Sequence, residues 1–154
     1  MDVEHFRELI APLTEAIAGT AIDARLAAEL ERRFPPGGEA FRAIEAACHE
    51  AIAAGWMCRE GAAGRRFGRV IEPGPESGGL SVDVVDLEDV VGPHHRHPTG
   101  EVCMIMPLTE GAAFDGQGAG WKVSEAGSAH RPTVTGGQAL VLYMLPGGKI
   151  EFTG

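Results

Sequence analysis

The stretch GPHHRHPTGEV, residues 92–102, places three histidines and a carboxylate within eleven positions. Successive side chains of a β-strand point to opposite faces, so His95 and His97 would share one face and His94 would point away from it. The PTG segment favours a turn, after which Glu101 would begin the next strand and return toward the same side. Two imidazoles and a carboxylate on one face are typical of a metal site. The competing interpretation places these histidines in exposed turns.

The next strand supports an inward position for the carboxylate. Glu101, Cys103 and Ile105 would share a face, so Glu101 would lie against a largely apolar interior. An isolated buried carboxylate is costly, and a bound cation would remove that cost. A further histidine, His130 in AGSAHRPTV, could complete the set from a later strand. Three imidazoles and one carboxylate suit Fe²⁺, Mn²⁺, Ni²⁺, Co²⁺ or Zn²⁺, with positions left for water or substrate.

The segments around this stretch are typical of short strands separated by glycine turns. They are FGRVIEP, LSVDVVDLEDVV, EVCMIMPL, GWKV, PTVTG, QALVLYMLP and GKIEF. Many short strands at this spacing predict a sandwich or small barrel. In LSVDVVDLEDVV the apolar alternation changes phase at Val85, which predicts a β-bulge there.

The first 55 residues have helical periodicity instead. Apolar residues recur three and four apart in three stripes: Val3, Phe6, Ile10, Leu13 and Ile17; Leu26 and Leu30; Phe41, Ile44, Cys48 and Ile52. We therefore predict a mainly β protein, with an N-terminal helical extension over residues 1–55 and a small β-barrel over residues 66–154. The apolar stripes could cover the barrel or support a homodimer or higher homo-oligomer.

Composition narrows the classes of partner. The formal net charge of −9 disfavours nucleic acid and anionic membranes, because an acidic surface gains nothing from displacing their counterions. The hydrophobic fraction of 44% is ordinary and indicates no membrane span. Three cysteines without a CxxC pair, and a start lacking a signal-peptide pattern, predict a reduced chain in the cytoplasm.

Two motifs of the cupin superfamily resemble segments of this chain. HHRHPTGE contains H-x-H-x3-E and GSAH contains G-x2-H, so His95, His97, Glu101 and His130 match the four ligand positions. No glycine stands six residues before His95, no asparagine stands four residues after His130, and Glu125 occupies the position of the second motif's proline. These departures affect turns rather than ligands. The resemblance implies a cupin-type barrel, a double-stranded β-helix or jelly roll, that holds a divalent transition metal.

A narrower resemblance covers nearly the whole chain. The order GWMCRE, GRVIEP, SVDVVDL, GPHHRHPTGEVCMIMPL, GAAFDG and GSAHRPTVTGGQALVLYMLPGGKIEF, behind helices, is similar to the bacterial 4-hydroxylaminobenzoate lyase family of nitroaromatic catabolism. The resemblance implies conversion of 4-hydroxylaminobenzoate and water into 3,4-dihydroxybenzoate and ammonia. The metal would act as a Lewis acid without an external oxidant. Glu101 would be either a ligand or a general acid or base.

A small aromatic acid requires groups for its ring and its carboxylate. Tyr143 and Trp121 are candidates to stack on the ring or hydrogen-bond to it, with packing in the core as the alternative, and we also include Tyr143 among the candidate catalytic residues. The carboxylate could bind one of four basic side chains: Arg69, Arg96, Arg131 or Lys149. Strand alternation places Arg96 opposite the ligands, and Arg131, beside His130, meets a similar objection.

Two other functions use the same residues. A cupin dioxygenase would bind Fe²⁺ through the same four side chains and oxidise a catechol or aminophenol, consuming oxygen. A metal-stabilised barrel without catalytic activity would bind a small ligand and unfold when the metal is removed.

Overall fold

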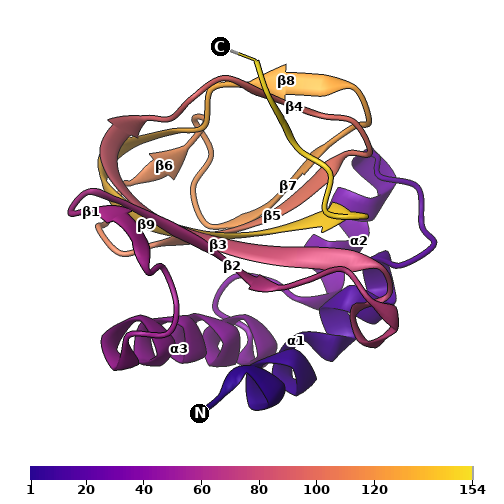
Figure 1. Ribbon diagram of the computed structural model, residues 1–154. Helices are drawn as coiled ribbons and strands as arrows, with labels where there is room; N and C mark the ends of the chain where they lie inside the picture. Colours follow the sequence, from indigo (N-terminus) through magenta and orange to yellow (C-terminus); the bar gives the residue numbers. More distant parts are fainter. Residues whose placement is uncertain (154) are drawn as a thin grey trace.

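The computed structural model describes residues 1–153, beginning with three helices (Figure 1). These are α1 (Val3–Ile17), α2 (Ala24–Arg33) and α3 (Glu39–Ala54). Asp2 and Asp23 cap α1 and α2 by accepting hydrogen bonds from backbone N–H groups of the first turn. Gly55, in the left-handed conformation with φ of 87°, ends α3. The predicted helical N-terminal segment is confirmed.

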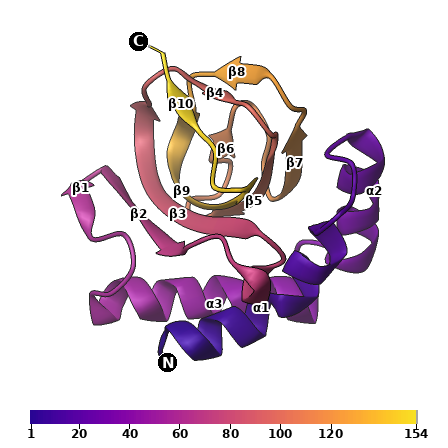
Figure 2. The same cartoon turned by 45° about the vertical axis from the view of Figure 1, so that its right-hand side comes forward.

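The remaining chain forms two antiparallel sheets that face each other around a barrel interior (Figure 2). The strands are β1 (Glu60–Ala62), β2 (Arg65–Ile71), β3 (Leu80–Val91), β4 (His95–His97), β5 (Glu101–Pro107), β6 (Ala113–Phe114), β7 (Gly120–Ser124), β8 (Ser128–His130), β9 (Thr133–Pro146) and β10 (Glu151–Phe152). The larger sheet has the order β1-β2-β3-β9-β5-β7, with β6 paired to β9, and the smaller sheet has the order β10-β4-β8. The mainly β architecture is therefore as predicted.

The predicted bulge at Val85 is wrong. Val85 pairs regularly with Phe67 of β2 and with Val141 of β9. The register between β3 and β9 shifts instead between Glu88 and Val90, around Asp89 with its positive φ of 41°. The sequence loses its alternation at Val85 because β3 has apolar side chains on both of its faces.

These two faces belong to different apolar clusters. On β3, β5 and β9, one set of alternate residues packs with the helices: Val82, Val84, Val102, Met104, Met106, Leu140, Leu142 and Met144. The other set lines the barrel interior: Val85, Leu87, Cys103, Ile105, Ala139, Val141 and Tyr143. The sheet is therefore covered by helices on one face and encloses a pocket with the other.

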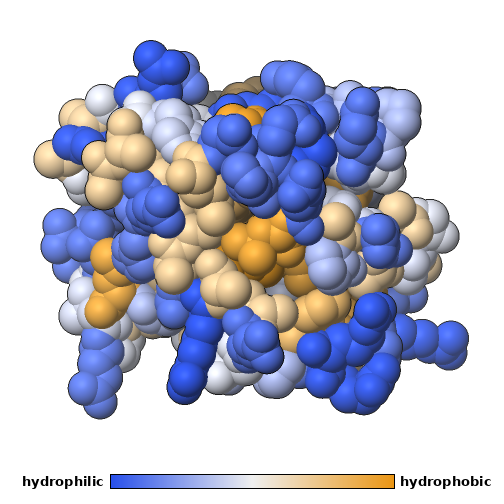
Figure 3. Space-filling view, turned by 90° about the horizontal axis from the view of Figure 1, so that it is seen from below, coloured by the Kyte–Doolittle hydropathy of each residue, from blue (hydrophilic) through white to orange (hydrophobic). Residues whose placement is uncertain are grey.

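The helices contribute their apolar stripes to the same cluster as the outer face of the sheet. Seen from the helix side, hydrophilic side chains surround much of the surface, and a small strongly hydrophobic group lies near its centre (Figure 3). The helices thus act as a cover for the outer face of the larger sheet.

Within residues 1–153, no helix is both long and apolar enough to cross a bilayer.

Candidate metal centre

Three strands bring the four predicted ligands together. In the β4–β8 pair, His95 lies directly opposite His130, and His97 follows on the same face of β4. Glu101 is the first residue of β5, after the PTG turn. One ligand atom from each of the four residues lies within 4.8 Å of the others. His95 and His97 are 6% and 0% exposed, so the alternative of histidines in exposed turns is wrong for this pair.

Each imidazole is held through its Nδ1 atom. Nδ1 of His95 lies 3.2 Å from the carbonyl oxygen of Pro93, and Nδ1 of His97 lies 3.2 Å from Oγ of Ser128. Nδ1 of His130 lies 2.5 Å from Oδ2 of Asp115. Such partners orient a metal-binding imidazole and leave its Nε2 for the metal.

The Nε2 atoms of the three histidines converge on one another and on the Glu101 carboxylate. A carbonyl and a carboxylate only accept hydrogen bonds, so Nδ1 of His95 and of His130 is the donor in these contacts. The Nε2 atoms of the two rings lie 3.1 Å apart. Nε2 of His97 is buried without a hydrogen bond, although it lies 3.1 Å from Oε2 of Glu101. This donor set fits a divalent cation, which would satisfy the atoms that the fold leaves facing one another.

The surroundings of His95 and Glu101 favour the protonation states in which these side chains bind a metal. Burial, together with His130, lowers the pKa of His95, which keeps its imidazole neutral. Burial by itself would raise the pKa of Glu101, but the adjacent His97 and the Cys103 thiol outweigh it and the pKa is lowered. Cys103 Sγ donates to Oε1 of Glu101 over 3.1 Å, which leaves Oε2 directed toward His97. Glu101 is thus a buried, ionised carboxylate beside the three histidines and the Cys103 thiol.

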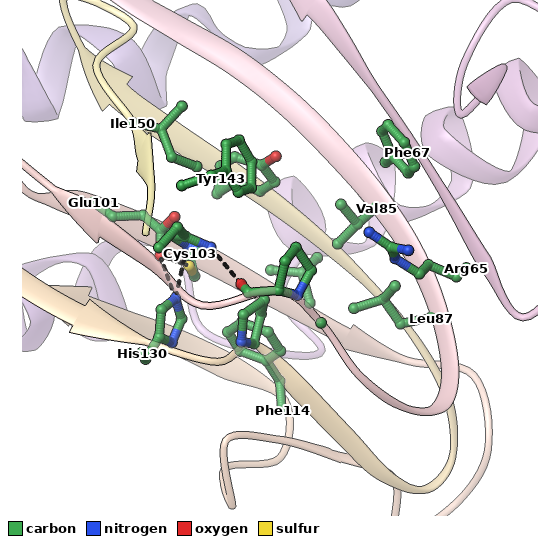
Figure 4. A pocket seen from close by; sticks show the side chains of 16 residues that line it. Arg65, Phe67, Val85, Leu87, Glu101, Cys103, Phe114, His130, Tyr143 and Ile150 are labelled. Carbon is green, nitrogen blue, oxygen red and sulfur yellow. Dashed lines mark hydrogen bonds and ion pairs between the residues drawn. The ribbon is translucent and has the colours of Figure 1, made fainter. Parts of the chain in front are cut away.

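A cavity of about 160 Å³ opens beside these ligands (Figure 4). Glu101 and His130 lie at one side of it, and His95, which pairs with His130, also lines it. Its walls are mainly apolar: Phe67, Val85, Leu87, Phe114, Pro132, Val141, Ile150 and Phe152. Tyr143 also lines it, and burial raises the pKa of this phenol far above its usual range, so Tyr143 keeps its proton. The cavity can therefore hold a flat apolar group against a polar end.

Several predicted residues lie elsewhere. Trp121 is 3% exposed on the helix side, where it packs against Phe34 and Phe41 and its Nε1 donates to the carbonyl of Phe34. Arg131 is exposed and does not line the cavity. The structure thus places Trp121 in its packing alternative rather than beside the cavity, because strand alternation turns it toward the helices.

The other basic candidates are also outside the cavity or already paired. Arg96 pairs with Glu151 on the outer side of β4, over 3.2 Å, and Lys149 does not line the cavity. Arg69 is exposed and does not line the cavity; it pairs with Asp83 over 3.1 Å and donates to the carbonyl of Gly148.

Two residues near the site were missed in the sequence. Asp115, in GAAFDG, holds His130 and also accepts the backbone N–H of Thr133. Arg65, at the start of β2, lines the cavity. Arg65 alternates with Phe67 and Arg69, which places the three side chains on one face of β2. The sequence did not indicate which strand pairs with β2, and so did not show that this face borders the cavity. No local pattern could pair Asp115 with a histidine fifteen positions away.

Comparisons with known proteins agree with this geometry. The family model of 4-hydroxylaminobenzoate lyase (PnbB) matches residues 8–152. The 4-hydroxylaminobenzoate lyase of Nocardioides sp. (strain LMS-CY) is 32% identical, over 80% of this chain and 78% of that protein. The 4-hydroxylaminobenzoate lyase of Pseudomonas putida is 30% identical, over 80% of each chain.

Solved structures resemble the fold more than the sequence. A chain from the crystal structures of the DMSP lyases RdDddP and RnDddQII aligns with a TM-score of 0.58, over 99% of this chain and 97% of that chain, at 14% identity. A protein of unknown function with a cupin-like fold, from Ralstonia eutropha JMP134, aligns with a TM-score of 0.41 over 55% of this chain and 56% of its own, at 21% identity. The two-sheet barrel is the predicted cupin fold. With its family model matching almost from end to end, the chain belongs to the 4-hydroxylaminobenzoate lyase family.

Proposed function

We propose that the protein is a metal-dependent lyase that converts 4-hydroxylaminobenzoate and water into 3,4-dihydroxybenzoate and ammonia. The observation that carries the proposal is the convergence of three imidazole Nε2 atoms and the Glu101 carboxylate at the polar end of an apolar cavity. Membership of the lyase family supports the choice of substrate and reaction.

The residues that would hold the metal are His95, His97, His130 and Glu101. Their mixed nitrogen and oxygen donors suit a divalent transition metal such as Fe²⁺, Mn²⁺, Ni²⁺, Co²⁺ or Zn²⁺. When bound, the metal supplies Lewis acidity that makes the hydroxylamino oxygen a better leaving group.

The surrounding side chains position the substrate and its protons. Val85, Leu87 and Val141 form part of the apolar wall against which an aromatic ring can lie. The phenol of Tyr143, which stays protonated, can donate a hydrogen bond to the hydroxylamino group or to the oxygen that leaves it. Glu101 can accept a proton through Oε1, whose hydrogen-bond donor is the Cys103 thiol.

The reaction balances without an oxidant. The N–O bond breaks and its electron pair leaves with oxygen, so the ring becomes electron-poor. That oxygen takes up a proton and leaves as water. A second water then attacks the ring carbon next to the one bearing nitrogen, and this carbon gives up its hydrogen as a proton when the ring becomes aromatic again. Water adds to the resulting imine carbon, the C–N bond breaks, and ammonia leaves as the ring regains its aromaticity. One water is consumed in total, and no electrons are exchanged with another molecule.

The first test is an anaerobic assay of protein with a measured metal content. We expect ammonia and 3,4-dihydroxybenzoate in equal amounts from 4-hydroxylaminobenzoate, loss of both after chelation, and recovery on adding one of the candidate metals. Product that forms only in air, with oxygen uptake, would instead establish an oxygenase. An undiminished rate in metal-free protein would contradict the metal dependence.

A second test concerns Tyr143. Tyr143→Phe removes only the hydroxyl group, and we expect kcat to fall by about 10²-fold, since one hydrogen bond to developing charge contributes about 10²–10³-fold. Phe114→Leu is the matched control, because it alters the cavity wall without removing a polar group. An unchanged kcat in Tyr143→Phe would limit Tyr143 to lining the cavity.

A further inference from the structure

The cavity has a second polar end, opposite the candidate ligands. Within residues 1–153, sixteen residues line the cavity, and Arg65 is the only arginine or lysine among them. Figure 4 shows its side chain beside Val85 and Leu87, across the cavity from Glu101, Cys103 and His130. Apolar side chains separate the two ends, so the cavity is polar at both ends and apolar between them.

Strand register explains this arrangement. On the inner face of β2 and β3, Arg69 lies opposite Asp83, Phe67 opposite Val85, and Arg65 opposite Leu87. The cross-strand row of Arg69 and Asp83 continues to Tyr143 on β9 and Cys103 on β5. This row therefore lies at the end of the cavity that holds the candidate ligands. Arg65 lies four residues before Arg69 on β2, which is two cross-strand rows away. At the usual rise of a strand, this separation is about 13 Å. The long side chain of Arg65 reaches back over the apolar middle row.

The two arginines on this face differ in their charge partners. Arg69 is paired with Asp83 and lies 3.8 Å from Glu72. In the described part of the chain, residues 1–153, Arg65 takes part in no ion pair, and its guanidinium lies 5.7 Å from the ring centre of Phe67. Contact with an aromatic ring orients a guanidinium while leaving its N–H groups free to bind an anion.

We propose that Arg65 binds the carboxylate of the substrate and thereby selects aromatic acids over neutral aromatic compounds. This role rests on the proposed function, because 4-hydroxylaminobenzoate is a rigid molecule with its carboxylate and its reacting nitrogen at opposite ends. An arginine fork matches a carboxylate by donating two parallel hydrogen bonds. With Arg65 holding the carboxylate, the ring lies along the apolar middle of the cavity and its nitrogen points toward the histidines.

The kinetic test compares Arg65→Gln with Arg66→Gln on two substrates. Arg66 is the matched control, because it is the next residue on β2, is exposed, and faces the opposite side of the sheet. For Arg65→Gln we expect kcat/KM to fall at least tenfold with 4-hydroxylaminobenzoate, mainly through KM, and to change less than twofold with N-phenylhydroxylamine, which lacks the carboxylate. Arg65→Lys should retain part of the preference, and Arg66→Gln should resemble the wild type. Equal losses on both substrates would overturn the proposal.

A binding experiment separates this proposal from the proposed function. 4-Aminobenzoate has the carboxylate but no N–O bond to break, so its affinity can be measured by calorimetry without turnover, with aniline as its neutral counterpart. We expect the wild type and Arg66→Gln to bind 4-aminobenzoate at least tenfold more tightly than Arg65→Gln does. A wild type that binds 4-aminobenzoate in this way but does not turn over 4-hydroxylaminobenzoate would refute the lyase reaction and keep the role of Arg65. Equal affinities in wild type and Arg65→Gln, or no binding to either, would overturn the role of Arg65.

Discussion

The two faces of the larger sheet are built from the same strands but serve different purposes. The outer face of β3, β5 and β9 is apolar and is sealed by the helices. The inner face of the same strands carries Asp83, Glu101, Cys103 and Tyr143 among its apolar residues. Alternation thus lets one set of residues stabilise the barrel while the other, one position away, forms the candidate site.

The polar groups on the two faces are satisfied in different ways. On the outer face, Trp121 donates its Nε1 to Phe34 over 2.9 Å and its backbone N–H to Glu31 over 2.7 Å. On the inner face, burial raises the pKa of Asp83 to about 6 although Arg69 is bound to it. Opposite this face, on β4 of the smaller sheet, Nε2 of His97 has no hydrogen bond. The inner face therefore retains polar groups in less favourable surroundings, as is common at functional sites.

The strongest test of the site that the inner face encloses is removal of one ligand. His97→Ala should lower kcat/KM by at least about 10³-fold, because a Lewis-acidic metal contributes several kcal/mol to transition-state stabilisation. Metal content should fall in parallel, measured by elemental analysis of the purified protein. The control is His94→Ala, since His94 precedes β4, is not one of the four candidate ligands and contacts Thr153 instead. Full activity in His97→Ala would contradict the assignment of the site.

The corresponding test of the outer face is Trp121→Ala. We expect the free energy of unfolding to fall by about 3–5 kcal/mol, as for other large buried aromatic residues. The folded fraction should keep its metal content, because Trp121 touches the helices rather than the cavity. Chemical denaturation and metal analysis on the same preparation give both quantities, with Trp121→Phe as the milder control. Metal loss at full stability would reverse the assignment of the two faces.

The raised pKa of Asp83 on the inner face predicts that the free energy of unfolding depends on pH. Its pKa of about 6 in the folded protein lies above the usual value, chiefly because of burial, so the folded state binds more protons between about pH 4 and 6. The contribution of Asp83 to stability is therefore present below about pH 4 and falls by about 3 kcal/mol as the pH rises to about 6.

Denaturation of wild type and Asp83→Asn across this range tests the sign. The difference in the free energy of unfolding, wild type minus variant, should decrease from about pH 4 to about 6 and then level off. A difference that increases with pH would mean that Arg69 lowers the pKa of Asp83 more than burial raises it.

The smallest expected effect concerns the residue that orients His130. Asp115→Asn keeps an acceptor for Nδ1 but removes the negative charge, and should weaken metal binding by about 10–100-fold. The change corresponds to about 1.4–2.8 kcal/mol of binding free energy. Competition with a chelator of known affinity measures it. Lys122→Gln is the control, because its Nζ lies 3.5 Å from Asp115 without contacting a ligand. Equal metal affinity in wild type and Asp115→Asn would leave Asp115 a purely structural role.

Much of this protein followed from local patterns in its sequence. Helical periodicity placed the three helices, and strand alternation placed His95 and His97 on one face with Glu101 returning to it. These predictions held because each depends on the repeat of the element itself, 3.6 residues for a helix and two for a strand.

The rest was decided by which strands lie side by side. Alternation assigns a residue to a face but does not say what covers that face, so Trp121 could not be assigned to the helix side. For the same reason, the apolar residues on both faces of β3 were interpreted as a bulge at Val85. The pairing of β2 with β3, and of β3 with β9 some sixty residues away, places Arg65 beside the cavity and Arg69 beside Asp83. Such contacts depend on register between distant segments, and only the folded chain sets that register.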